Sequence, residues 1–97
     1  MKHLIRCAAL VLALALAAPA QAACYADYKA KQDSPLRLHY GVIELPDTAC
    51  ADAGAATQTV AARLAAQGWT LLNVLGLFGP EGLAERKDSA GDNFLRF

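Results

Sequence analysis

Two cysteines are the most reactive side chains between positions 23 and 97, and their spacing limits the chemistry they can perform. Cys24 and Cys50 could form a disulfide, a redox-active pair or part of a metal site. Redox-active pairs are usually spaced C-x-x-C, which these two are not, and a metal site needs further ligands nearby. The sequence therefore predicts one disulfide, closing a loop that runs from residue 24 to residue 50, or 27 residues.

His39 is the second candidate for chemistry, since the other histidine of the chain is His3. A hydrolytic triad would need Ser34 or Ser89 to reach His39, and neither serine lies in a G-x-S-x-G context. We therefore expect His39 to be a surface or cross-strand residue. The alternative hypothesis is a small-ligand binder or an enzyme that uses His39 with Tyr40 or a nearby acid.

The acidic residues near the C-terminus do not form a convincing site. Residues 88–93 have some likeness to a calcium loop, but they lack the acid at the third position, the glycine at the sixth and the closing glutamate. Glu81 and Glu85 lie beside Arg86 and Lys87, as on the solvated side of a short helix. We predict no catalytic residue, no cofactor and no metal site.

Charge and composition exclude other classes of protein. Residues 23–97 contain seven basic and nine acidic residues, a formal charge of −2. Tyrosines and basic residues in the first half of this segment could stack on bases, but a negative charge disfavours binding to nucleic acid. The segment is too short for two domains and too apolar to be disordered.

The first 22 residues have the pattern of a secretory signal peptide. Lys2 and Arg6 precede an apolar run from residue 7 to residue 18, and Ala20-Gln21-Ala22 forms a small-x-small cleavage motif. The run has 12 residues, whereas a membrane-spanning helix needs about 20. We expect cleavage between Ala22 and Ala23, no stable membrane anchor, and a periplasmic or secreted protein.

Alternation predicts that the segment starting at residue 23 begins with a β-hairpin. From Cys24 to Gln32, small or aromatic residues alternate with charged ones, which is the period of a half-buried strand. Residues 33–35 have turn chemistry, and a second strand follows from Leu36 to Leu45. Its predicted apolar face consists of Leu36, Leu38, Tyr40 and Val42, and its polar face of Arg37 and His39.

A helix and an apolar strand are predicted next. Apolar residues at three- and four-residue steps predict a helix from about Ala53 to Gln67, ended by Gly68. The segment from Trp69 to Phe78 is apolar on both sides, which is typical of a central strand covered on both faces. Simple alternation places Trp69, Leu71, Leu75 and Leu77 on one face and Leu72, Val74 and Phe78 on the other.

The remaining residues complete a predicted α+β domain spanning 23–97. Glu81 to Lys87 could form one or two helical turns with Leu83 facing inward, and Asn93 to Phe97 reads as a last short strand. The order β-β-α-β-β predicts one helix on a mostly antiparallel four-stranded sheet. One helix covers one face of a sheet, so the connection at 79–92, a second copy or a partner must cover the other.

The junction Leu64-Ala65-Ala66-Gln67-Gly68-Trp69-Thr70-Leu71-Leu72-Asn73-Val74 resembles a motif of small bacterial domains of unknown function. In those domains a helix ends in Gly-Trp, and a strand then carries Leu and Val (GW-x-L-x-x-V) ahead of a final strand with an aromatic and a basic residue. Phe94-Leu95-Arg96-Phe97 matches that final strand, and Thr70 replaces the usual acidic residue. The resemblance implies the same α+β fold and no catalytic residues.

These patterns together favour association over catalysis. We expect an exported binding or interaction module of unassigned biochemical function, held together by the disulfide and acting as a homodimer or with an envelope protein. An inhibitor or accessory subunit of an exported enzyme is a further hypothesis, beside the His39 alternative.

Overall fold

The hairpin forms where the alternation predicts it. In the computed structural model, which describes residues 23–97, β1 (Cys24–Gln32) pairs antiparallel with β2 (Arg37–Leu45) in continuous register from Cys24 opposite Leu45 to Gln32 opposite Arg37. The predicted signal peptide at 1–22 and its cleavage site between Ala22 and Ala23 lie at and before the start of the described residues, so the structure does not test them.

Helix α2 (Ala53–Ala66) follows a short 3₁₀ helix, η1 (Asp47–Ala51). The side chain of Asp52 caps α2 by accepting a hydrogen bond of 2.9 Å from the amide of Gly54. Gly68 has φ +82°, a left-handed conformation that ends a helix at little cost only when the residue is glycine. Within residues 23–97, no helix combines the length and the hydropathy needed to cross a bilayer.

Strand β3 (Thr70–Phe78) lies at an edge of the sheet, so the prediction of a central strand was wrong. The sheet has three strands in the order β2-β1-β3, and β1 is the strand with a neighbour on both sides. The apolar run of β3 suggested a central strand, but the central strand is β1, which is buried on both faces. The charged residue of β1 that is buried, Asp27, is paired within the fold. None of the side chains of β3 reaches the same depth of burial.

Two bulges also change the faces predicted for β3. The pairing with β1 shifts between Leu71 and Asn73 and again between Val74 and Gly76, which leaves Leu72 and Leu75 as extra residues. Each extra residue moves the alternation by one position. Val74 therefore joins the inward side chains, and Leu75 becomes 47% exposed.

The C-terminal segment forms a second helix and no fourth strand. After η2 (Pro80–Gly82), α3 (Ala84–Ala90) and η3 (Gly91–Asn93), Phe94 makes one isolated parallel bridge to Val42. Leu95 has φ +56°, which takes the backbone out of the extended region and prevents a strand. The fold of residues 23–97 is thus α+β with three strands and two α-helices, and not the predicted β-β-α-β-β arrangement with one helix.

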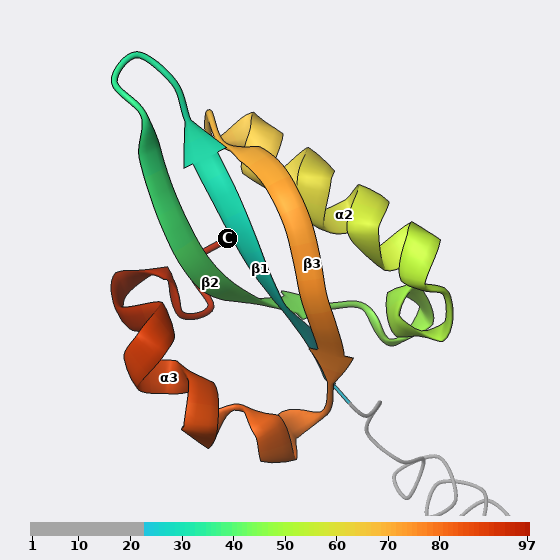
Figure 1. The fold of residues 1–97 in the computed structure, drawn as a ribbon. Coiled ribbons are helices and arrows are strands. Elements are labelled where there is room, and N and C mark those ends of the chain that lie inside the picture. Colours follow the sequence, from blue (N-terminus) through green and yellow to red (C-terminus); the bar gives the residue numbers. More distant parts are fainter. Residues whose placement is uncertain (1–22) are drawn as a thin grey trace, which may run out of the picture.

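The two helices lie on different parts of the sheet (Figure 1): α2 packs mainly against β3, and α3 packs against β2. The larger core lies under α2, where Ala56, Val60 and Leu64 contact the inward side of β1 and β2. A smaller core lies under α3, where Leu83 and Ala90 pack with residues of all three strands. The connection at 79–92 therefore covers part of the second face, which is one of the three expected solutions.

The predicted disulfide is present between Cys24 and Cys50, whose Cα atoms are 6.3 Å apart. It joins the start of β1 to η1, the connection that leads into α2. Because α2 covers the main core, the cross-link holds the entry to this helix at the sheet.

Candidate functional site

His39 lies on the inward face of β2, where the sequence had placed it on a polar face. The register puts His39 opposite Ala30, with Gly41 and Ile43 on the same side of the strand. Its imidazole stacks on the ring of Phe97 at 5.5 Å between centroids. The ring of Trp69 meets it edge-on at 4.2 Å. His39 is therefore a half-buried cross-strand residue within an aromatic cluster, which is one of the two roles expected for it.

The hydrogen bonding of His39 fits packing better than catalysis. The hydroxyl of Tyr28, a fully buried residue, forms a hydrogen bond of 2.9 Å with Nε2 of His39. Burial raises the pKa of Tyr28 to about 12, so the hydroxyl stays protonated at neutral pH. Nδ1 of His39 is buried and has no hydrogen-bond partner in residues 23–97. Neither Ser34 nor Ser89 hydrogen-bonds to this imidazole in that segment, so no nucleophile is paired with it.

The stability of the protein is expected to fall on acidification before carboxylates titrate. Burial, with a smaller contribution from the charge of Arg96, lowers the pKa of His39 below its ordinary value of 6.5. The unfolded chain then binds a proton at a higher pH than the folded chain. The contribution of His39 is thus fully present above pH 6.5 and is lost as the pH falls through the lower folded pKa.

Denaturant titrations at several pH values, with NMR titration of the imidazole, measure this effect. His39→Gln is the control, because its amide keeps a hydrogen-bonding group near Tyr28 but does not take up a proton. A folded-state pKa at or above 6.5 would contradict the burial argument and would reopen the hypothesis of an exposed functional histidine.

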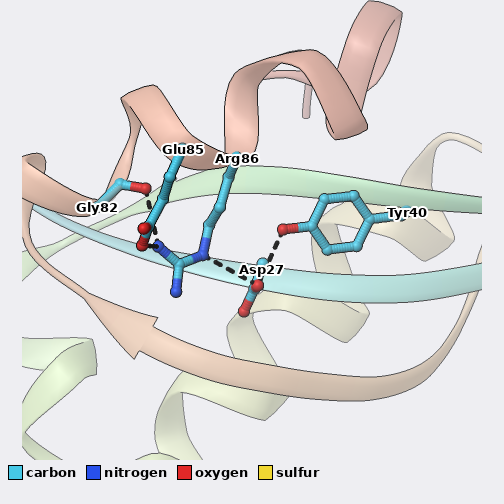
Figure 2. A network of polar contacts seen from close by, with 5 residues as sticks. All are labelled: Asp27, Tyr40, Gly82, Glu85 and Arg86. Carbon is cyan, nitrogen blue, oxygen red and sulfur yellow. Dashed lines mark hydrogen bonds and ion pairs between the residues drawn. The ribbon is translucent and has the colours of Figure 1, made fainter.

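A second polar group, which the sequence did not reveal, ties α3 to the sheet (Figure 2). Nε of Arg86 donates a hydrogen bond of 3.1 Å to Oδ2 of Asp27. The hydroxyl of Tyr40 donates to the same oxygen at 2.9 Å. Arg86 also donates to the carbonyl of Gly82 at 2.8 Å and to the carboxylate of Glu85 at 2.7 Å.

This group of residues is structural in character. Asp27 is 8% exposed, and a buried carboxylate needs hydrogen bonds and an opposite charge. Burial and the hydrogen bond to Asp27 raise the pKa of Tyr40 to about 12, so its hydroxyl remains a donor. The guanidinium of Arg86 lies 3.9 Å from the ring centroid of Phe78, which ties α3 to β3 as well. The alternation in β1 predicted that Asp27 faces solvent, because the pattern of a single strand contains no information on the helix, α3, that covers this position.

The remaining polar candidates do not come together. In the segment from 23 to 97, no three His, Cys, Asp or Glu side chains are arranged to hold a metal ion. Glu81, Glu85 and Asp88 are exposed, as expected for the solvated side of a short helix. Residues 88–90 belong to α3 and residues 91–93 to η3, so no calcium loop forms there.

One feature left unexplained by internal packing is the side of the molecule formed by α2 and β3, here called the α2–β3 side. Leu72 and Leu75 are 50% and 47% exposed at the open edge of the sheet. A groove of about 440 Å³ runs between this edge and the helix. Its lining consists of Thr57, Ala61 and Ala65 from α2 and of Trp69, Thr70, Leu71, Leu72 and Asn73 from the strand side.

This side carries almost no charge. Of the sixteen charged residues between 23 and 97, Arg63 is the one that falls within residues 53–78. The guanidinium of Arg63 donates to the carbonyl of Glu44 on β2, away from the β3 edge. Exposed edge strands usually carry charges or proline that prevent pairing with other chains, and β3 has neither.

Comparison of the chain with protein-family models, with curated proteins and with solved structures found no match in any of the three. The resemblance to small bacterial domains with a GW-x-L-x-x-V motif therefore stays a prediction. Its last element, a final strand at Phe94 to Phe97, is not formed in this fold.

Proposed function

We propose that this protein is an exported binding module that acts by associating with another polypeptide through the α2–β3 side. The observation that carries the proposal is an edge strand without charge that exposes Leu72 and Leu75 beside an apolar groove. The cores of protein interfaces are depleted in charged residues and enriched in apolar side chains, and this surface has that composition.

Two features support export. The disulfide between Cys24 and Cys50 is of the kind that persists in oxidising compartments such as the periplasm or the cell exterior. The first 22 residues have the order of a signal peptide, with cleavage expected between Ala22 and Ala23. Both features support a location in which the α2–β3 side would meet envelope or secreted proteins.

Photo-crosslinking in a bacterial host tests this proposal. The full-length chain is expressed with a photo-reactive residue in place of Leu75, and the cells are fractionated after irradiation. We expect the protein in the periplasmic or secreted fraction and a crosslinked adduct from position 75. The matched control is the same substitution at Leu36, which is 64% exposed but lies in the hairpin turn.

Two results would overturn the proposal. Retention of the protein in the cytoplasm would remove export, and an adduct yield at Leu75 no higher than at Leu36 would remove association through the α2–β3 side.

A further inference from the structure

We infer that the occupant of the α2–β3 side is a second copy of this chain, bound about a two-fold axis perpendicular to the sheet with the two β3 edges antiparallel. This inference rests on the proposed function and names its partner and its geometry. In residues 23–97, β3 has β1 as its single strand neighbour, so every backbone group on its outer side lacks a strand partner.

Charge favours a second copy. In a two-fold interface the same surface meets itself, so any charge it carries faces a like charge. Residues 53–78 contain one charged residue, and Arg63 points toward β2. The α2–β3 side can therefore meet its own copy without repulsion, whereas it offers no opposite charge to steer a different partner.

The shape of α2 allows the copies to approach. The proposed axis places both α2 helices on the same face of a six-stranded sheet, with their flanks toward each other. Those flanks carry Thr57, Ala61 and Ala65, which are small. The hydroxyl of Thr57 donates to the carbonyl of Ala53 at 2.9 Å, so its burial leaves no unpaired donor.

The size of the surface indicates a reversible dimer. A helix of 14 residues is about 21 Å long, and a strand of 9 residues is about 30 Å long. Each element is about 10 Å across, so together they offer roughly 500 Å² of surface per copy. About 1,000 Å² in total is at the lower end for specific interfaces. Because two bulges bend β3, we expect Leu72 and Leu75 to contribute more than a full ladder of backbone hydrogen bonds.

Light scattering coupled to size-exclusion chromatography tests this inference on protein that is purified after expression of the full-length chain. We expect a dimer whose fraction rises with concentration. Leu75→Glu should weaken it by roughly a hundredfold, because like charges meet at the axis. Leu75→Lys should do the same, and mixing the two variants should restore a dimer. That rescue separates a loss of association from a loss of folding.

Leu36→Glu is the matched control, because Leu36 is 64% exposed and lies in the turn between β1 and β2. We expect this variant to dimerise like the unmodified protein. A monomer at every concentration, or a dimer that survives Leu75→Glu, would overturn the second copy as occupant. If a monomer still gave a Leu75 adduct with another protein in cells, this inference would fail and the proposed function would stand.

Discussion

Replacing Cys24 and Cys50 with alanine is expected to lower the free energy of unfolding by about 3.5 kcal/mol. The disulfide closes a loop of 27 residues (24 to 50) that contains the whole β1–β2 hairpin. Without the cross-link, the unfolded chain gains the entropy of this loop, while the folded chain keeps its contacts. For a domain of 75 residues (23 to 97), the loss corresponds to about 20 °C in melting temperature, measured by circular dichroism.

Reduction of the unmodified protein provides the matched control. The reduced protein and the double-alanine variant should melt at similar temperatures, both well below the oxidised protein, because both lack the same constraint. If the double-alanine variant melted within a few degrees of the oxidised protein, the packing of η1 and α2 on the sheet would be enough to hold this region, and the disulfide would not be needed for folding.

The local elements of this fold were largely predictable from the sequence. Period-two alternation located β1, and the apolar stripe ending at Gly68 located α2, because both patterns reflect burial of one face of a single element. The disulfide was predictable because two cysteines without C-x-x-C spacing, in a chain with the pattern of an export signal, leave few alternatives. The turn-forming residues at 33–35 also located the turn between the two strands of the hairpin.

The order of the strands was not predictable, because it depends on which surface each element finds. The apolar run of β3 suggested a central strand, but the bulges at Leu72 and Leu75 turn two of its leucines outward at an edge. Asp27, in the central strand β1, was expected to face solvent, but in the fold Arg86 and Tyr40 both donate hydrogen bonds to it. Both errors have one cause, which is that single-strand patterns carry no information on partners distant in the sequence.

The sequence predicted that the candidate surface is apolar and uncovered, but it did not predict where on the fold this surface lies. The sequence indicated that a sheet with one helix would leave an apolar face uncovered, and it favoured association for that reason. In the fold, α3 covers part of that face, and two of the leucines that stay exposed, Leu72 and Leu75, lie at the β3 edge. The absence of charge between residues 53 and 78 was visible in the sequence, and it would have pointed to this side.

Gly41→Ala is expected to lower the free energy of unfolding by about 3 kcal/mol, because the main core has no room for one more methyl group. Gly41 lies directly opposite Tyr28 in the β1–β2 register, and the tyrosine ring covers it. A Cβ atom at Gly41 would come within 2.6 Å of Cζ of Tyr28 and into contact with its hydroxyl oxygen. Tyr28 is fully buried and its hydroxyl is held by His39, so the ring has nowhere to move.

Gly76→Ala is the matched control, because the same change in β3 brings Cβ no closer than 3.5 Å to Oδ1 of Asp27, an ordinary contact. We expect this variant to unfold within about 1 kcal/mol of the unmodified protein in denaturant titrations. Tyr28→Leu should make Gly41→Ala much less costly, since the clashing ring is then absent and the two changes are not additive. Equal costs for the two glycine variants would show that Tyr28 moves aside, and that the aromatic cluster around His39 is looser than its contacts indicate.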